Sequence, residues 1–495
     1  MKRVDALASA IIAQSDYTEL DRIYLRNRLF ALIGEDTGNA ETQETELIPL
    51  VHELGPDEIL TSAVMDFITP PPHVVNAQFW NDYAVDPQKA ISNFYSLNCR
   101  NDYIKLGDIA RNIEFTAPSD YGDIEITINL SKPEKDPKAI AAAKNAPQSD
   151  YPLCQLCMEN EGYAGRVNHP ARAQHRIIRV ELDDENKKNS KTNTTWKHTW
   201  GFQYSPYAYF NEHCIFLDAE HSPMEITTQT FRELLQLVDL FPGYFAGSNS
   251  DLPIVGGSIL SHNHYQGGRH IFPMDKASTE YEFTLKGVKA EILKWPMSVI
   301  RLRSDDPHAL IEAAEHVAES WKTHSDETVD VIANSNGTRH HTVTPIARKD
   351  GDAYILNLVL RDNHTSEEHP DGVFHPHKDV QHIKKENIGL IEVMGLAILP
   401  PRLKEEMAAV ERYLQDTTAD EQAAIRTSGI AEYHLEWARN IKAANPQRAI
   451  IDTSALVKEE IGHVFVRVLE DAGVFKCDEQ GRAAFHRFLN LIGES

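Results

Sequence analysis

The sequence predicts an α+β protein with helical segments at both ends. Apolar residues follow helical spacing over about the first 110 residues, strand-like runs dominate the middle of the chain, and the residues from about 402 onward are again helical in pattern. Strand runs mixed with few helices fit an α+β architecture better than regular βαβ alternation. A chain of 495 residues, 41% of them hydrophobic, is long enough for two or three folding units.

The first 150 residues are predicted to form a helical extension and a linker. The stretches RVDALASAIIAQS and TELDRIYLRNRLFALIG carry apolar residues at helical spacing, and Gly34 is the predicted end of the second helix. Residues 131–150 are polar, charged and proline-rich, which is typical of an exposed connection. The extension is therefore expected to cover residues 1–150.

Two sets of strands and helices follow, and a helical region ends the chain. In residues 151–280 we expect strands at 176–182, 213–219 and 258–264 and a helix at 227–247. In residues 281–401 we expect strands at 283–293, 298–304 and 352–362 and a helix at 307–324. No sequence repeat is visible, but the order of elements is loosely similar in the two sets. Residues 402–495 form the last predicted region.

Charge and composition exclude several classes of partner. The chain has 49 basic and 74 acidic residues, a net charge of −25, which argues against nonspecific binding of nucleic acid or of anionic membranes. Its first twenty residues lack the apolar core and cleavage site of a signal peptide, and no transmembrane stretch is found. Five cysteines are too few for a disulfide framework in a chain of this length. We expect a cytoplasmic protein with neither nucleic acid nor membrane as partner.

The stretch DLPIVGGSILSHNHYQGG, residues 251–268, carries the strongest chemical pattern. If SILSHNHYQ is a strand, His262, His264 and Gln266 share one face because strand side chains alternate. Gly256 and Gly257 allow the backbone to approach a ligand closely. Three polar groups beside bare backbone favour a ligand site, while the alternative is a pair of partly buried histidines packed in a sheet.

The sequence CQLC, with Cys154 and Cys157, is typical of zinc binding or thiol exchange. Its flanks have the pattern of a loop, whereas a redox pair usually starts a helix. The other cysteines, Cys99, Cys214 and Cys477, are isolated, so any further zinc ligands must be histidines. From spacing alone, a metal site and a coincidental pair stay equally open.

Two further stretches hold histidines. Residues 201–221 carry His213, His221 and an aromatic cluster, which could stack on a base but more often fills a core. A second His-x-His, His375 and His377, has lysines nearby but no glycine-rich loop. Such a positive spot binds a sugar phosphate or is simply a solvated face, the commoner outcome.

The 251–268 stretch resembles the signature of the second-type galactose-1-phosphate uridylyltransferases, the UDP-glucose–hexose-1-phosphate uridylyltransferases typical of Gram-positive bacteria. The chain length, the helical N-terminal extension and an LPPRL segment are also similar to that family. The resemblance implies membership of the histidine-triad superfamily, with two histidine-triad-like halves built on antiparallel sheets. It also implies a homodimer and no organic cofactor.

In the first type of this enzyme the motif is His-Pro-His-x-Gln, whose first histidine binds zinc and whose second is the nucleophile. The resemblance therefore implies that His264 is the nucleophile and that Gln266 hydrogen-bonds the phosphoryl oxygens. It implies a structural zinc site held by Cys154, Cys157, His221 and His262. Asn263 replaces the proline of the first type.

Substrate contacts follow from the same resemblance. Phosphate is expected to bind at Gly256 and Gly257 with either Ser258 or Ser261. Uridine is expected at Tyr204, Ser205, Pro206 and Tyr207. The segment KKENIGLIE resembles a hexose-contacting segment and implies hexose binding by Lys385 and Glu392.

The implied reaction moves UMP from UDP-glucose to galactose 1-phosphate through a uridylyl-histidine at His264. A neutral imidazole is a good nucleophile at pH 7, and its second ring nitrogen is expected to donate to a backbone carbonyl. Two alternatives stay open: a histidine-triad nucleotide hydrolase or phosphorylase, and a non-catalytic zinc-stabilised binding protein. The sequence does not choose between galactose and a 2-acetamido hexose as the acceptor sugar.

Overall fold

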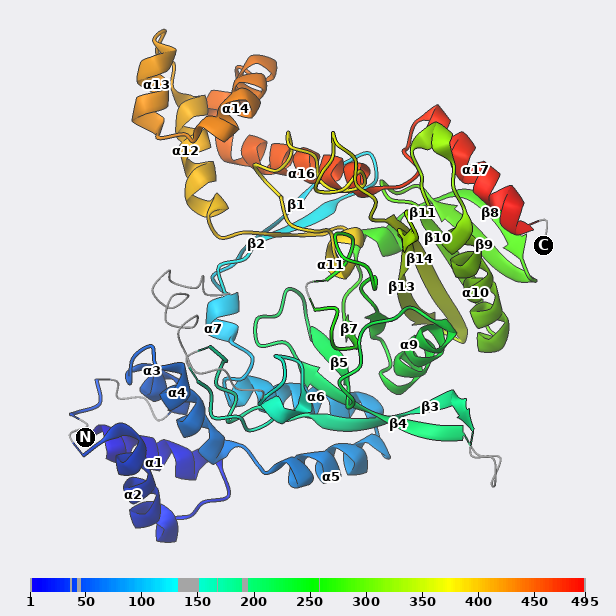
Figure 1. Cartoon of the computed structure of the whole chain (residues 1–495). Helices are drawn as coiled ribbons and strands as arrows, with labels where there is room; N and C mark the ends of the chain where they lie inside the picture. The colour runs from blue at the N-terminus through cyan, green and yellow to red at the C-terminus, as the bar shows by residue number, and fades with distance from the viewer. Residues whose placement is uncertain are drawn as a thin grey trace.

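The computed structural model describes residues 2–35, 38–41, 46–131, 151–166, 168–188, 195–257 and 259–493. Its centre is a ten-stranded antiparallel sheet in the order β3-β4-β5-β7-β6-β13-β14-β10-β9-β8 (Figure 1). Helices gather at both ends of the chain, so the predicted α+β class with helical extensions is confirmed.

The large sheet consists of two halves with the same order of elements. The first half contains β3 (Ile178–Lys188), β4 (Thr195–Tyr204), β5 (Cys214–Asp218), α9 (Thr228–Leu240), β6 (Phe245–Gly247) and β7 (His264–Gly268). The second contains β8 (Thr279–Leu285), β9 (Val288–Leu293), β10 (Val299–Ser304), α10 (Pro307–Thr323), β13 (His341–Asp350) and β14 (Ala353–Asp362). In each half the third strand leads into the helix, and the fifth strand lies between the third and fourth. The two halves join edge to edge, because β6 pairs with β13.

Helices α9 and α10 pack on one face of this sheet. Phe231, Leu234 and Val238 of α9 and Leu310 and Val317 of α10 belong to one buried cluster with the sheet's apolar residues. Pro307 at the first turn of α10, after the capping carboxylate of Asp306, fixes where that helix begins. A short hairpin, β11 (Asn334–Ser335) and β12 (Thr338–Arg339), lies between α10 and β13.

The N-terminal helices form two groups. The helices are α1 (Arg3–Gln14), α2 (Arg22–Ile33), α3 (Leu47–His52), α4 (Glu58–Met65), α5 (Pro72–Tyr83), α6 (Pro87–Arg100) and α7 (Leu106–Ile109). Helices α1 to α4 bury their own apolar cluster. Helix α5 lies against the edge strand β3, where Trp80 Nε1 donates to the Arg179 carbonyl at 3.1 Å. The extension is thereby attached to the first half of the sheet.

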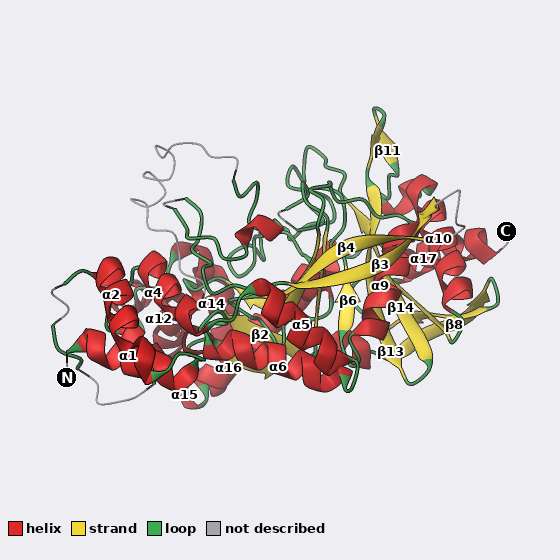
Figure 2. Cartoon of the chain, turned by 90° about the horizontal axis from the view of Figure 1, so that it is seen from below, coloured by secondary structure: helices red, strands yellow, loops and turns green. Residues whose placement is uncertain are grey.

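The C-terminal helices pack in two places, the last of them beside α10 and β8 and the others around a separate small sheet. They are α12 (Leu403–Gln415), α13 (Glu421–Ser428), α14 (Glu432–Ala444), α15 (Arg448–Ile451), α16 (Thr453–Ala472) and α17 (Glu479–Gly493), preceded by α11 (Leu390–Val393). Helix α16 packs on a small sheet of β1 (Ile113–Ala117), β2 (Ile124–Ile128) and β15 (Leu396–Leu399). Figure 2 shows α16 and β2 side by side, away from the second-half strands β13 and β8. No helix of the described residues is long and apolar enough to span a membrane.

Several element predictions need correction. The predicted strand 258–264 is mostly loop, because β7 begins only at His264. The predicted helix 227–247 ends at Leu240, and its last residues form strand β6. The predicted strand 283–293 is a hairpin, since Lys286 and Gly287 both have positive φ, the requirement of a tight two-residue turn. Most of the linker predicted at 131–150 lies outside the described residues.

Candidate active site and metal-ligand cluster

A cavity of about 400 Å³ opens over strands β5 and β7 of the first half. Ile215 of β5 and its cross-strand partner Gln266 of β7 line it together with His264. Residues of the N-terminal extension, among them Tyr103 and Lys105, also line it. The cavity therefore lies where the extension meets the sheet.

His264 is held in one orientation at the start of β7. Its Nδ1 lies 2.8 Å from the carbonyl oxygen of His262, which makes Nδ1 the donor and leaves Nε2 available to the cavity. Burial lowers the pKa of His264 to about 4, so the ring is neutral at pH 7. The structure thus has the backbone hydrogen bond expected for a nucleophilic imidazole.

His262 faces away from this cavity, toward the cysteine pair. Because β7 begins at His264, His262 lies in the preceding loop and the alternation of strand side chains does not reach it. The expectation that His262 shares one face with His264 and Gln266 is therefore wrong.

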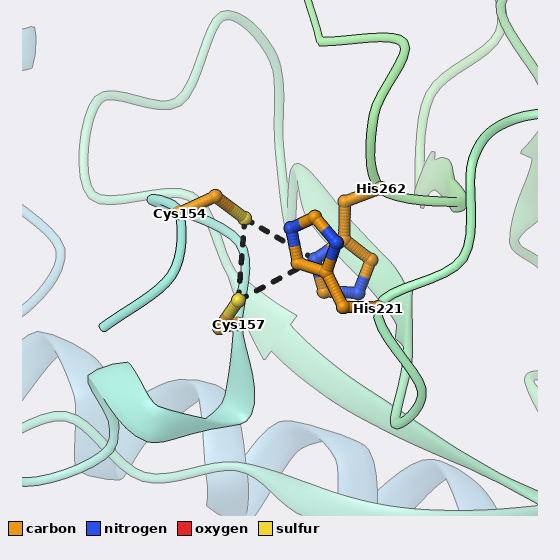
Figure 3. Close-up of side chains that lie close together, drawn as sticks. All are labelled: Cys154, Cys157, His221 and His262. Carbon is orange, nitrogen blue, oxygen red and sulfur yellow. Dashed lines mark hydrogen bonds between the residues drawn. The ribbon is translucent and has the colours of Figure 1, made fainter. Parts of the chain in front are cut away.

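Four predicted metal ligands lie together. The ligand atoms of Cys154, Cys157, His221 and His262 are all within 4.8 Å of one another (Figure 3). The two Sγ atoms are 3.4 Å apart, and His262 Nδ1 lies 3.2 and 3.7 Å from them. Atoms bound to one zinc ion at about 2.0–2.3 Å in a tetrahedron are separated by about 3.5 Å. The cluster therefore has the donor set and spacing to hold a metal ion.

Neighbouring groups fix these ligands in place. His262 Nε2 donates to the Asp218 carbonyl at 2.8 Å, which turns Nδ1 toward the sulfur atoms. Asn160 Nδ2 donates to the carbonyls of both Cys154 and Cys157 at 2.8 Å. Burial alone would raise the pKa of Cys154, but hydrogen bonds from His262 and from the Leu156 amide lower it to about 6. A thiolate, the form that binds metal, is favoured there.

The glycine loop before β7 contributes one glycine to the cavity and one to packing. Gly257 lines the cavity, whereas Gly256 lies against Ser250, whose carbonyl oxygen would be 2.5 Å from an added Cβ. Ser258 is outside the described residues. Ser261 is exposed and does not line the cavity, where Ile259 lies instead, so the expectation for Ser261 is not supported.

The second half of the sheet holds this loop. The buried carboxylate of Asp251 accepts hydrogen bonds from Arg339 Nη2 at 2.8 Å and Thr342 Oγ1 at 2.5 Å. Asn363 Nδ2 donates to the Pro253 carbonyl at 3.2 Å. The loop's position over the first half is thus set by side chains of the second.

Three of the four residues expected at uridine line the cavity: Ser205, Pro206 and Tyr207. Tyr204 is a core residue instead. Its ring is 1% exposed and packs on Phe94 and Phe202, and its Oη lies 3.1 Å from that of Tyr244. The expectation that Tyr204 contacts a nucleoside is wrong.

The two residues expected at the hexose do not line the cavity. Lys385 is exposed, whereas its neighbour Lys384 is buried and lies 3.1 Å from Glu392. Glu392 also accepts from the Gly389 amide at 3.2 Å, so its carboxylate caps the first turn of α11. The structure thus places Lys385 on the surface and Glu392 at a helix cap, and hexose binding by them stays a prediction.

Asn249, His213 and Arg172 are among the cavity residues that were not predicted from sequence. Asn249 lines the cavity and accepts from the Leu390 amide at 2.9 Å, and His213 lies 3.1 Å from Gln266. Arg172 also lines the cavity, and its guanidinium makes no ion pair or hydrogen bond with the part of the chain that the structure describes. Nothing in the pattern HPARAQHR sets Arg172 apart from its neighbours, so only the fold identifies it.

Two family models match this chain. The model of the galactose-1-phosphate uridyl transferase N-terminal domain matches residues 15–223, and the model of its C-terminal domain matches residues 237–439. A galactose-1-phosphate uridylyltransferase of Streptococcus mutans is 57% identical over 99% of both chains. One of Streptococcus pneumoniae is 54% identical, again over 99% of both chains.

Among solved structures, yeast Ap4A phosphorylase Apa2 in complex with Ap4A is 10% identical, with a TM-score of 0.36 over 71% of this chain and 94% of that one. The family models, by contrast, span most of the chain. On these matches, the chain belongs to the galactose-1-phosphate uridyl transferase family.

Proposed function

We propose that this protein transfers UMP from UDP-glucose to galactose 1-phosphate through a uridylyl group carried on His264. The observation that carries the proposal is the hydrogen bond from His264 Nδ1 to the His262 carbonyl, which leaves a neutral Nε2 at the cavity. Family membership supplies the substrate class.

The reaction consists of two displacements at the α-phosphorus of UDP-glucose. In the first, the Nε2 lone pair of His264 forms the N–P bond, the bond from phosphorus to the bridging oxygen breaks, and glucose 1-phosphate leaves. In the second, a phosphate oxygen of galactose 1-phosphate attacks the same phosphorus and the N–P bond breaks. Both displacing groups are phosphates, so no general base is needed to activate a hydroxyl.

Three groups are suited to hold the negative charge of the transferred phosphoryl group. The amide of Gln266 lies two residues from His264 on the same face of β7, and Gly257 brings backbone close to the cavity. The guanidinium of Arg172 is a cation without an internal counter-charge among the described residues, and Arg binds phosphates through paired N–H groups. Ser205, Pro206 and Tyr207 are proposed as the wall beside uridine.

The cluster of Cys154, Cys157, His221 and His262 is proposed to hold a structural zinc ion. When bound, zinc would crosslink the CQLC segment to the loop that precedes β7. His262 is two residues from His264, so fixing it also fixes the backbone carbonyl that orients the nucleophile. All four ligand positions belong to the protein, which is typical of a structural site.

The test is capture of the covalent intermediate. Incubation with UDP-glucose labelled in its α-phosphate is expected to give one acid-labile, base-stable label per chain, lost when galactose 1-phosphate is added and recovered in UDP-galactose. His264→Asn is expected to take up no label, while the matched variant His375→Asn, in the second His-x-His, labels normally. Labelling of His264→Asn would overturn the proposal.

The same experiment separates the alternatives. Steady release of UMP without galactose 1-phosphate would indicate a hydrolase, and zinc binding without label or turnover would indicate a binding protein. A panel of hexose 1-phosphates, including 2-acetamido sugars, defines the acceptor. We also propose a homodimer and a cytoplasmic location; the first is measured by light scattering, and the second is supported by five cysteines that form no disulfide.

A further inference from the structure

We propose that His213 is a positioning residue that turns the amide N–H groups of Gln266 toward the transferred phosphoryl group. The inference rests on the proposed function, because it concerns the same phosphoryl site. His213 lines the cavity but does not belong to the metal cluster or to the residues expected at uridine or hexose.

The fold places His213 beside Gln266. His213 immediately precedes β5, and two residues later Ile215 pairs with Gln266 across the β5–β7 ladder. The side chains of residues 213 and 215 therefore lie on one face, and His213 Nε2 is 3.1 Å from Gln266 Oε1. The ring is 4% exposed and contacts Tyr209 and Phe210 at ring-centre distances of 5.5 and 4.6 Å, which restricts its rotation.

The unpaired nitrogen of His213 indicates which tautomer is present. Its Nδ1 is buried and has no hydrogen-bond partner among the described residues. A neutral imidazole has one N–H donor and one lone-pair acceptor, and a buried N–H without an acceptor is the more costly of the two to leave unpaired. The proton therefore belongs on Nε2, which donates to Gln266. Burial lowers the pKa of His213 to about 4, so the ring stays neutral at pH 7 and only one tautomer has to be chosen.

This tautomer decides which end of the Gln266 amide faces the cavity. If His213 Nε2–H donates, Gln266 Oε1 must be the acceptor and the NH₂ group points the other way. On β7 the cavity and His264 lie in that direction, since residues 264 and 266 share one face. The NH₂ group can then donate to phosphoryl oxygens. A reversed amide would present its carbonyl oxygen to the anionic phosphate and repel it.

His213 acts through Gln266 and does not itself contact the reacting atoms. Removal of the His213 side chain is therefore expected to slow the displacement at phosphorus, in which the phosphoryl oxygens need hydrogen-bond donors. Substrate binding should be nearly unchanged. The loss of one such donor typically costs about 100-fold in rate. Since the donor belongs to Gln266, the losses of rate caused by substituting His213 and by substituting Gln266 should not add.

The test uses single-turnover formation of the labelled uridylyl-enzyme and steady-state kinetics. His213→Met removes the donor at similar volume and is expected to lower kcat about 30- to 100-fold with KM changed less than about threefold. His213→Gln returns an N–H group near the position of Nε2 and is expected to recover most of the rate. Gln266→Ala should lose as much as His213→Met, and the double variant should be no slower than Gln266→Ala alone.

Two outcomes would overturn the inference. They are additive losses in the double variant, and a His213→Gln protein as slow as His213→Met. Rates are taken per labelled site, so that a poorly folded fraction does not mimic a slower reaction. Absence of label in the unmodified protein would refute the proposed function itself, whereas normal labelling with additive losses would refute only the role of His213.

Discussion

The fifth strand of each half occupies the same place in the sheet, between the third and fourth strands of its half. In the first half this strand is β7, with the sequence HYQGG, and its polar side chains His264 and Gln266 line the cavity. In the second half it is β14, AYILNLVLRD, which has no histidine or glutamine and is almost wholly buried. The two halves therefore share a topology but not a chemistry.

The difference begins in the residues that lead into each fifth strand. A sixteen-residue loop joins β6 to β7 and holds two of the glycines that approach neighbouring atoms closely, whereas a two-residue turn joins β13 to β14. A long loop at the start of a strand exposes backbone and side chains at the sheet end, and a tight turn does not. The second half contributes by bracing that loop through Asp251. The site is thus built on one half and stabilised by the other.

The largest expected effect comes from the metal cluster, which only the first half possesses among the described residues. Purified protein is expected to hold one zinc per chain, and Cys157→Ser should lose the metal and at least about 100-fold in activity, since ligand loss also frees His262. Elemental analysis and turnover measure both. Cys99→Ser, at an isolated cysteine, is the control; an unchanged rate in metal-free protein would contradict the structural role.

The second prediction tests the contacts by which Arg339 and Thr342 of the second half hold Asp251 of the β6–β7 loop. Asp251→Asn removes a buried charge that Arg339 and Thr342 contact and is expected to cost about 3 kcal/mol of stability, because a half-buried guanidinium loses its partner. Chemical denaturation measures the loss. Arg303→Ala, which removes an exposed ion pair with Asp350 in the same half, should change stability by less than about 1 kcal/mol. Equal losses of stability in the two variants would show that the contacts of Asp251 stabilise the protein no more than an exposed ion pair does.

The third prediction compares cations of the two halves. Arg172→Ala is expected to raise KM for UDP-glucose about 30-fold, because a charge-assisted hydrogen bond contributes about 2 kcal/mol. Lys385→Ala, at the lysine that sequence resemblance assigned to the hexose, should change KM less than twofold, since its side chain is exposed away from the cavity. Steady-state kinetics with both substrates measure these values. The reverse ranking would restore the original hexose assignment.

These contrasts also show what could be predicted from the sequence. From spacing alone the cysteine pair stayed open between a metal site and coincidence, and the full ligand set and the role of His264 were predicted only through the family resemblance. Cys154 and His262 lie 108 residues apart, so no local pattern joins them. Tyr204 could not be separated from Tyr207, since strand alternation decides which ring enters the core and the strand's end was not known. Arg172 and Asn249 reach the cavity only through the packing of the extension and of α11 on the sheet, and such long-range contacts leave no local pattern.

The smallest expected effect concerns Asn263, which stands where first-type enzymes have proline. Its backbone N–H donates to the Ser222 carbonyl at 2.7 Å, and its carbonyl accepts from the Asp218 amide at 3.1 Å. Proline has no N–H, so Asn263→Pro is expected to lose the first bond and about 1 kcal/mol of stability, whereas Asn263→Ala keeps both. Thermal unfolding of the two variants measures the difference. If the proline variant were as stable as the alanine variant, the hydrogen bond to Ser222 would contribute no stability. It would then not explain why this chain has asparagine and not proline at position 263.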